Sequence, residues 1–470
     1  MPSKRIWVTH TFAGGWGPDF GPSFYGAPGP DGSLQIPWLL DAENLVYEFD
    51  GGPHKAPGTT QLNGTTLGAS SAVKGIFDYW RQGTGGTPTQ RVIAHVDTRI
   101  VQDTGAGVMG DIATGLVDGA VPQYSTFNDL LILASDATAD VPRSWDQTTF
   151  QNLAGSPPRV SCSVPHKNRH WAAGDFANPS RLSYSAHNAP DNWTGAGSGS
   201  MEIDPNDGDM ITGIISHKDS LFVFKGPYTG SIHRILGSTP EEFSRVIFTR
   251  GLGAAWINGI FRFGDDIGFI SPRGTIHSLA TTASFGDFNL SYLSYPFGSF
   301  CETGFNHSRL RHASAITHPG KGIVLISFAG SGSTDNNRVL MMDYRWLAQG
   351  ERYPRWSLWT SYSLASLALV LDTNSRPRFF GGTYAGRILR MDQTDRSNNG
   401  SAINYKAKTP WLTYGSELHM KTLGSASIGI RSKNSNNITL QWQRDNAAAQ
   451  TQTVAQGGAS VWGPTATGAM

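Results

Sequence analysis

Residues 217–224 read HKDSLFVF, and after a short break residues 231–235 read SIHRI. Residues 264–270 read GDDIGFI, and residues 274–279 follow as GTIHSL. Both stretches have the same order: a polar turn, a short apolar run, a second turn and another short run. Runs of about four to eight residues bounded by Gly, Asn, Asp or Pro are typical of β-strands. The two stretches therefore predict neighbouring strands in a repeated unit.

Similar apolar runs recur along the chain at intervals of about fifty residues. With one anchor residue taken from each run, the successive gaps are 39, 51, 47, 57 and 53 residues, for Ile132, Trp171, Phe222, Phe269, Ile326 and Phe379. β-Propeller blades repeat about every 40–50 residues, and each blade holds a four-stranded antiparallel sheet. Residues 61–400 therefore predict an all-β propeller of about seven blades, and six or eight blades also fit.

Other architectures agree less well with the pattern. A large β-sandwich is the main alternative fold. A β-helix would need a shorter and stricter repeat than the one in this sequence. Trp145-Asp146 is the only Trp-Asp pair, which speaks against WD repeats, and only residues 379–382 place a glycine pair as kelch repeats do. Residues 363–371 are the best helical candidate, but they are apolar nearly all round and read equally well as a buried strand.

The composition also favours short strands joined by turns. Glycine supplies 56 of the 470 residues, about 12% against a usual ~7%. Asp outnumbers Glu by 28 to 8, and Arg outnumbers Lys by 26 to 11. Glu and Lys favour helices, whereas Asp and Gly favour turns. The 39% apolar share can build a core, which excludes a disordered chain.

Several other classes of protein are excluded in the same way. No stretch approaches the ~18 apolar residues of a membrane span, and residues 1–7 lack the apolar core of a signal peptide, so we expect no membrane insertion. The formal net charge of +1 gives no bulk attraction to DNA or to an anionic membrane. One disulfide between Cys162 and Cys301 is conceivable, but two buried free thiols fit the composition better.

The two ends of the chain differ from its middle. Residues 1–60 hold turns and one extended piece, residues 44–49 (NLVYEF), and we expect this segment to pack on the propeller. After a polar break, residues 438–443 (ITLQWQ) alternate strictly between apolar and polar side chains, as a half-buried strand does. We expect residues 401–470 to form a small β-rich domain with a flexible C-terminal tail, because the last residues are rich in Ala, Gly and Thr.

Three motifs resemble binding sites, and each has a plainer interpretation. Residues 105–110 (GAGVMG) match the dinucleotide pattern G-x-G-x-x-G, but residues 111–119 make a poor helix, so we interpret the motif as a turn. Residues 204–209 (DPNDGD) resemble a calcium loop but lack the EF-hand spacing, which indicates a tight turn. His166 and His170 would share a strand face, but no third ligand lies near them. We therefore predict no cofactor-binding and no metal-binding residue.

The catalytic motifs are equally weak. Cys162 lies in residues 160–164 (VSCSV), which read as a buried strand, and neither H-E-x-x-H nor G-x-S-x-G occurs. Residues 185–193 (SAHNAPDNW) only approach the sialidase Asp-box and are not repeated. We predict no catalytic residue. A propeller-fold glycoside hydrolase is the alternative from another class, and it would need paired carboxylates at a set separation.

Two groups of motifs, in their order along the chain, carry a resemblance to a known family. The first group is residues 12–16 (FAGGW), 44–47 (NLVY), 51–52 (GG) and 55–58 (KAPG). The second group is residues 182–185 (LSYS) with 190–193 (PDNW), 203–211, 218–225, 251–253 (GLG), 270–274 (ISPRG), 355–359 (RWSLW) and 382–388 (GTYAGRI). Together they resemble the β-propeller virion proteins of tailed bacteriophages, in particular the tail nozzle or tail hub of short-tailed phages, also called the packaged-DNA stabilisation protein. The family more often has a basic residue where this chain has Ala56.

The resemblance implies a structural virion protein of a phage tail, with no catalytic residue and no cofactor. Six copies would form a hexameric ring below the portal and the adaptor (head-to-tail connector) protein. That ring would retain packaged double-stranded DNA and conduct it non-specifically during ejection, and tail fibres or spikes would dock on the tail. Assembly would take place in the cytoplasm of the bacterial host. The alternatives are a fibre-attachment or baseplate propeller of a phage tail, and a non-viral binding propeller.

Charge and aromatic content agree with such a role. Each phosphate neutralised by Lys or Arg adds salt-dependent affinity, so a nearly neutral chain suits DNA that must slide past. Aromatic and arginine side chains are enriched at protein interfaces. This chain has a cluster of them, which would otherwise be core residues of a blade: Trp346, Arg352, Tyr353, Arg355, Trp356 and Trp359.

Overall fold

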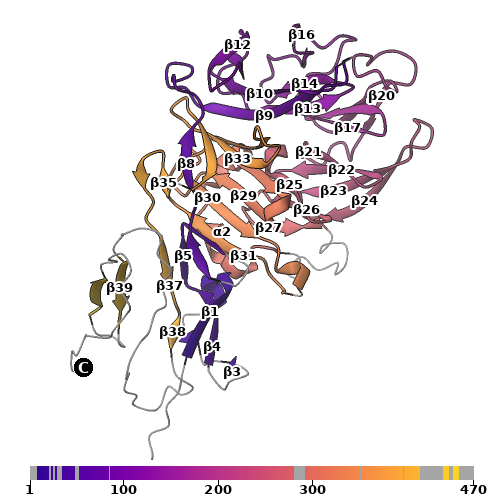
Figure 1. Cartoon of the computed structure of the whole chain (residues 1–470). Coiled ribbons are helices and arrows are strands. Elements are labelled where there is room, and N and C mark those ends of the chain that lie inside the picture. The colour runs from indigo at the N-terminus through magenta and orange to yellow at the C-terminus, as the bar shows by residue number, and fades with distance from the viewer. Residues whose placement is uncertain are drawn as a thin grey trace, which may run out of the picture. The chain divides into compact units, whose positions relative to one another are not determined.

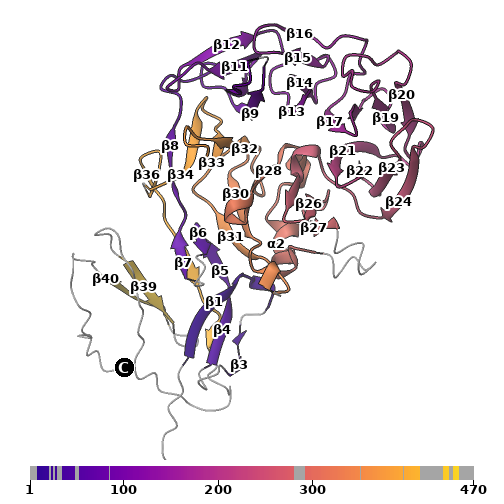
Figure 2. The same ribbon diagram turned by 45° about the vertical axis from the view of Figure 1, so that its right-hand side comes forward.

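The computed structural model divides the chain into two compact units, Met1–Gly415 and Ser416–Met470. It describes residues 8–20, 23–24, 27–28, 34–47, 52–83, 85–279, 292–349, 351–394, 396–412, 438–443 and 448–454. The first unit contains a seven-bladed β-propeller, which Figures 1 and 2 show as sheets arranged around a centre. The predicted all-β propeller of about seven blades is confirmed.

Blades 1 to 4 are four-stranded antiparallel sheets whose strands follow one another in the sequence. Blade 1 is β9 (Val73–Arg81), β10 (Thr89–Val96), β11 (Arg99–Asp103) and β12 (Met109–Ala113). Blade 2 is β13 (Pro122–Phe127), β14 (Leu130–Ser135), β15 (Arg143–Trp145) and β16 (Phe150–Asn152). Blade 3 is β17 (Cys162–His166), β18 (Arg169–Ala173), β19 (Arg181–Tyr184) and β20 (Gly199–Glu202). Blade 4 is β21 (Met210–His217), β22 (Ser220–Gly226), β23 (Ser231–Leu236) and β24 (Ser244–Arg250).

Blades 5 to 7 depart from this scheme. Blade 5 has three described strands, β25 (Ile260–Phe263), β26 (Asp266–Ile270) and β27 (Ile276–Ser278). Blade 6 begins with β28 (Ser314–His318), β29 (Ile323–Phe328), β30 (Arg338–Asp343) and β31 (Arg355–Trp359). Blade 7 begins with β32 (Ser366–Leu371), β33 (Pro377–Gly382) and β34 (Ile388–Gln393). Residues 363–371, which allowed either a helix or a strand, thus supply a strand.

Strands from both ends of the first unit complete blades 6 and 7. In blade 7, β8 (Gly58–Gln61) pairs antiparallel with β34 and also contacts β35 (Ser397–Asn398), which pairs with β36 (Ser401–Ala402). In blade 6, β5 (Asp41–Glu43) adds parallel to β31, and β37 (Lys406–Lys408) adds to β5. Segments from the predicted regions 1–60 and 401–470 therefore lie side by side on the propeller, and β8 closes the ring.

The remaining described elements lie outside the blade strands given above. In the first unit β1 (Val8–Trp16), β4 (Leu34–Leu39) and β3 (Ala27–Pro28) form one sheet, β2 (Ser23–Phe24) pairs with β38 (Trp411–Leu412), and β6 (Leu45–Tyr47) pairs with β7 (Pro53–Lys55). The helices within the described residues are η1 (Pro18–Phe20), η2 (Ile257–Gly259), η4 (Tyr295–Phe297), α2 (Gly298–Thr303), η5 (His307–His312), η6 (Pro319–Lys321) and η7 (Leu347–Gln349). The second unit contains the hairpin β39 (Ile438–Trp442) and β40 (Gln450–Val454), while the predicted tail beyond residue 454 lies outside the described residues.

Turn chemistry explains how the first two strands of a blade are joined. In blade 2, Asn128 and Asp129 have φ values of 48° and 61°, and in blade 3, Lys167 and Asn168 have φ values of 46° and 57°. Two successive residues with positive φ form the type I′ turn, whose twist matches that of the flanking strands. Asn and Asp tolerate this conformation better than most residues. Asp and Asn residues between the apolar runs therefore form hairpin turns.

Asn44 fastens the N-terminal segment to blade 6. Its side chain is buried, and its φ of 51° is one that Asn adopts readily. Nδ2 donates to Thr360 Oγ1 at 3.1 Å, to Ser361 Oγ at 3.2 Å and to the Asn404 carbonyl at 2.6 Å. Oδ1 accepts from the backbone N–H groups of Thr360 at 2.8 Å and Ser361 at 3.3 Å. One amide thus joins the segments before, within and after the propeller.

We expect Asn44→Gly to weaken closure of the ring, because glycine keeps the positive φ but removes the amide. Several buried donors and acceptors would lose a partner, at a cost of about 2–4 kcal/mol. For a unit of this size that cost corresponds to a fall of about 3 °C in the thermal midpoint, measured by calorimetry. Asn374→Gly, on an exposed turn of blade 7, is the control. Equal midpoints for the two variants would contradict the role of Asn44.

Buried histidines are the second polar feature of the propeller. His277 Nε2 lies 2.7 Å from Thr275 Oγ1, and His170 Nε2 lies 3.1 Å from Ser125 Oγ. Burial lowers the pKa of His277 to about 4 and that of His170 to about 3. Burial also lowers the pKa of His233 to about 4. These side chains are therefore neutral at pH 7.

We expect stability to fall as the pH drops from about 6.5 towards 4. In this window the unfolded chain binds protons at these histidines and the folded chain does not, so acid favours unfolding. A folded pKa near 4 in place of 6.5 corresponds to roughly 3 kcal/mol for His277 at the acid end of the window. His277→Gln should flatten the dependence of the thermal midpoint on pH, whereas substitution of the exposed His187 should not. Parallel pH profiles for wild type and His277→Gln would refute this.

Candidate functional site: an aromatic interaction surface

Four aromatic side chains from distant parts of the sequence meet at the surface. They are Phe20 of η1, Trp38 of β4, Tyr295 of η4, and Tyr353, which precedes β31. The rings of Tyr295 and Tyr353 stack with centroids 5.3 Å apart and planes 8° apart. Phe20 lies 6.0 Å from Tyr353 and 5.5 Å from Trp38. We call these four residues, together with Arg352, the aromatic surface.

Exposure and charge distinguish this cluster from a core. Tyr295 keeps 48% of its surface in solvent, and Arg352 is exposed. The Arg352 guanidinium lies 5.2 Å from the centre of the Tyr353 ring, a cation–π contact. Partial burial raises the pKa of Tyr353, so its hydroxyl remains a neutral donor and acceptor. The aromatic surface thus offers flat rings, a hydroxyl and one positive charge to a partner.

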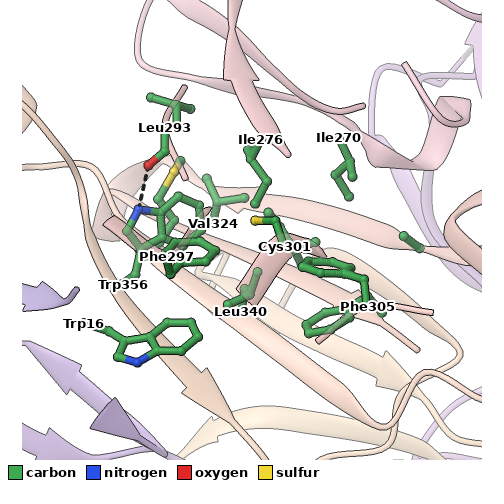
Figure 3. Close-up of a cluster of buried hydrophobic side chains, with 14 of the residues drawn as sticks. Trp16, Ile270, Ile276, Leu293, Phe297, Cys301, Phe305, Val324, Leu340 and Trp356 are labelled. Carbon is green, nitrogen blue, oxygen red and sulfur yellow. Dashed lines mark hydrogen bonds between the residues drawn. The ribbon is translucent and has the colours of Figure 1, made fainter. Parts of the chain in front are cut away.

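A buried aromatic stack holds the aromatic surface in place. Trp16 of β1 stacks on Phe297 with centroids 4.9 Å apart, and Phe297 meets Trp356 edge-on at 5.0 Å (Figure 3). The Trp356 Nε1–H donates to the Leu293 carbonyl at 3.1 Å, shown dashed in Figure 3. A Cβ at Gly15 would lie 2.8 Å from Trp356 N, and Gly15 has φ +64°, so only glycine fits there. The Gly15-Trp16 pair therefore allows β1 to approach blade 6 closely.

Such a surface is suited to binding another protein. Tyr, Trp, Phe and Arg are enriched where protein interfaces are fully buried, and stacked rings lose little entropy on binding. The predicted cluster divides between surface and core. Arg355, Trp356 and Trp359 are buried in blade 6, and Trp346 lies beneath Arg355, whereas Arg352 and Tyr353 reach the surface. Sequence reasoning missed Phe20, Trp38 and Tyr295, because no local pattern links segments hundreds of residues apart.

The dinucleotide-like motif is a hairpin turn. Residues 104–108 connect β11 to β12, and the Thr104 N–H donates to the Val108 carbonyl at 2.8 Å. Asp103 Oδ1 accepts the N–H groups of Gly105 at 2.8 Å and Gly107 at 3.2 Å. The amides that would have to bind a phosphate are already bound to a carboxylate. The prediction of a glycine-rich turn at residues 105–110 therefore agrees with the structure.

The calcium-like loop, residues 204–209, encloses a lysine side chain. Lys225 of β22 is completely buried. Its Nζ donates to four oxygens, the carbonyls of Ile203 at 2.7 Å and Asp204 at 2.8 Å, Asp207 Oδ1 at 2.8 Å and Ser180 Oγ at 3.1 Å. An ammonium group thus takes the place that a metal ion would need. The tight turn predicted here is a turn built around an internal cation.

The histidine, cysteine and Asp-box candidates all have structural partners. His166 and His170 lie on the two strands of the β17–β18 hairpin, both near its turn, and His166 Nδ1 is 2.9 Å from Ser216 Oγ. Burial raises the pKa of the Cys162 and Cys301 thiols to about 12, and both are free. Residues 185–193 form a compact loop in which Ala186 N–H donates to the Asn192 carbonyl at 2.8 Å.

None of the helices that the structure describes is long and apolar enough to cross a membrane. Within the described ranges, no three His, Cys, Asp or Glu side chains gather as metal ligands would. Among the described residues, the aromatic surface therefore remains the candidate functional site.

We expect Lys225→Met to destabilise blade 4, because four oxygens, two of them on the buried residues Ile203 and Ser180, lose their donor. Removing one partner of a buried ion pair costs about 3–5 kcal/mol, which should lower the thermal midpoint by roughly 3–6 °C. Lys218→Met, on an exposed turn of the same blade, is the matched control. Neither calcium nor a chelator should shift the wild-type midpoint. A rise with calcium would contradict the assignment of the loop to Lys225.

Comparisons with known proteins reveal only distant structural similarities. No protein-family model matches the chain, and no curated protein is significantly similar to it. Among solved structures, the crystal structure of BBS1N in complex with ARL6DN is similar over 73% of this chain and 99% of that one, at 11% identity and a TM-score of 0.43. The crystal structure of the Mitotic Checkpoint Complex is similar over 75% and 98%, at 10% identity and a TM-score of 0.41. Similarities this low carry no inference about the function of this chain.

Proposed function

We propose that this chain is a structural component of a bacteriophage tail, in the position of the tail nozzle or hub. In this role six copies form a ring below the portal and adaptor, retain the packaged DNA and conduct it during ejection. Its partners are the adaptor, fibres or spikes, and DNA that passes without sequence-specific contact. The protein is then located in the virion, after assembly in the host cytoplasm.

The observation that supports the proposal is where the family-like motifs lie. Asn44 joins three segments at blade 6, and the Tyr47 hydroxyl donates to the Trp356 carbonyl at 2.8 Å. The Tyr362 hydroxyl donates to the Pro57 carbonyl at 2.7 Å, beside β8. Gly15 packs on Trp356. The N-terminal motifs, residues 12–16, 44–47 and 55–58, thus meet residues 355–359 and their neighbours where the ring closes, while the motifs of the middle of the chain lie in blades 3 to 5.

Charge and surface also favour assembly. The net charge of +1 gives no bulk attraction to DNA, which suits DNA that must slide past. The aromatic surface has the composition of a protein interface, and we assign it to the neighbouring subunit of the ring. A heterologous contact of this kind, repeated around an axis, closes a ring.

The test is assembly of the purified protein, followed by mass photometry and by electron microscopy with the portal–adaptor complex. We expect a ring of six copies that binds on the portal axis. Tyr295→Asp should abolish the ring, because it places a charge in the stacked centre of the aromatic surface. Tyr228→Asp, at a tyrosine that is 78% exposed on blade 4, should leave the ring intact.

The alternatives give different results in the same experiments. A monomer that does not bind the portal–adaptor complex would rule out the nozzle role. Binding to isolated fibres or baseplate without ring formation would favour the attachment role. Turnover of a glycoside substrate would favour the hydrolase, provided that it is lost when a carboxylate pair is replaced.

A further inference from the structure

Three Asn-Gly dipeptides occur in the chain, at residues 63–64, 258–259 and 399–400. Such a pair can deamidate without an enzyme, because glycine has no side chain to hinder the attack of its backbone nitrogen on the asparagine amide carbon. The reaction depends on local structure, since that nitrogen must be free of other bonds and the asparagine must rotate towards it. The environment of each pair therefore decides which of the three can react.

The first pair is held by the side chain of Asn63, which is buried. Its Nδ2 donates to the Thr65 carbonyl at 2.7 Å and to the Gly386 carbonyl at 3.0 Å. Its Oδ1 accepts from the Ile388 N–H at 2.8 Å. The amide cannot turn towards the nitrogen of Gly64 without breaking these bonds, so the folded chain protects this pair.

The second pair is held by its backbone. Asn258 and Gly259 belong to η2, and Gly259 is buried. The Gly259 N–H donates to the Trp256 carbonyl at 3.0 Å. The nitrogen that would have to attack is therefore already bonded, and the folded chain protects this pair as well.

The third pair forms the turn between β35 and β36. Asn399 and Gly400 are exposed, and their φ values of 48° and 86° are the two positive values of a type I′ turn. A Cβ on Gly400 would meet no atom within 4 Å. Within the described residues, neither the Asn399 side chain nor the Gly400 N–H has a hydrogen-bond partner. Both reacting groups are therefore free and open to water.

The turn can open at little cost to the rest of the structure. Opening is required, because the Asn399 backbone must leave the type I′ conformation before the Gly400 nitrogen reaches the amide carbon. The two strands of this hairpin have two residues each, and among the described strands β36 pairs with β35 only. Both residues of β36 are exposed. A hairpin this short is marginally stable, and exposed ends of this kind open locally.

We propose that Asn399 is a site of spontaneous deamidation. The Gly400 nitrogen loses its proton to water or hydroxide and forms a bond to Asn399 Cγ, and the side-chain amide nitrogen leaves as ammonia. The resulting succinimide takes up one water molecule. Opening at the Cγ carbonyl gives aspartate. Opening at the backbone carbonyl gives isoaspartate, in which the main chain runs through Cγ and is longer by one methylene group.

The turn is connected to the strand that closes the ring. The Asn399 N–H donates to the Thr59 carbonyl of β8 at 3.0 Å, and Thr59 Oγ1 donates to Asn398 Oδ1 at 2.6 Å. Asn398 Nδ2 donates to the Ser361 carbonyl at 2.6 Å. Isoaspartate lengthens the main chain and adds a negative charge, so it displaces the turn from Thr59. Deamidation thus loosens the junction at β8 as the protein ages.

The test is ageing of the purified protein in mildly alkaline buffer, followed by tryptic mapping with electron-transfer fragmentation, which distinguishes isoaspartate from aspartate. Asn399 should convert roughly tenfold or more faster than Asn63 and Asn258, because the bonded sites require a larger local opening. In denaturant the three sites should react at similar rates. An unaged sample, digested in the same way, corrects for deamidation during digestion.

Asn399→Gly is the matched variant, because glycine keeps the positive φ and removes the reacting amide. Circular dichroism verifies that it folds, and each protein is compared with its own unaged sample. Ageing should lower the thermal midpoint of the wild type by about 1 °C, through the hydrogen bonds lost at Thr59. The midpoint of Asn399→Gly should stay constant.

Two results would overturn the proposal. One is conversion of Asn399 in the folded protein no faster than that of Asn63 or Asn258, which would mean that the turn stays closed. The other is a change in midpoint on ageing, zero or not, that is the same for the wild type and Asn399→Gly, which would separate the turn from the stability of the ring. Assembly through the aromatic surface is measured separately with Tyr295→Asp, so failure of one proposal does not imply failure of the other.

Discussion

A β-propeller depends on closing its ring, because its last blade must pair with something that precedes its first. Here β8 closes the ring by pairing with β34 of blade 7. A second connection is made at blade 6, where β5 pairs with β31. Each pairing is short, so the backbone alone provides few hydrogen bonds. Asn44 and the hydroxyls of Tyr47 and Tyr362 add side-chain bonds at the same junction. The rest of the circular arrangement is stable only while this junction holds, since an open ring exposes the cores between blades 6, 7 and 1.

Internal polar side chains perform tasks that a ligand might have performed. The Lys225 ammonium fills an oxygen-lined loop, and buried neutral histidines bond to hydroxyls of neighbouring residues. A buried polar group is tolerated only when it has partners, so each of these residues fixes the position of the strands around it. Residue types that suggest chemistry in the sequence thus act as structural links between strands. The sequence does not show that these side chains are buried. Their burial is what favours a structural role over a role in binding a ligand.

The parts of the fold that could be predicted from sequence are those set by local residues. Hairpins such as β13–β14 follow from short apolar runs joined by Asn128 and Asp129, and their spacing leads to the propeller. The ties made by β5, β8 and β37 could not be predicted, because three or four residues carry no periodicity and their partners lie hundreds of positions away. The aromatic surface was found only in part for the same reason. Arg352 and Tyr353 stand in an aromatic stretch, whereas Phe20 and Tyr295 reach them only through the tertiary structure.

The proposed ring contact is also constrained by symmetry. Contacts between unlike patches of the same chain build a ring with two different faces, as a tail component would need between the portal and the distal tip. A two-fold contact would instead join two rings back to back into an assembly with equivalent ends. Such a particle could not meet an adaptor on one side and fibres on the other. In the proposed ring, the aromatic surface must therefore meet a different patch of the neighbouring subunit.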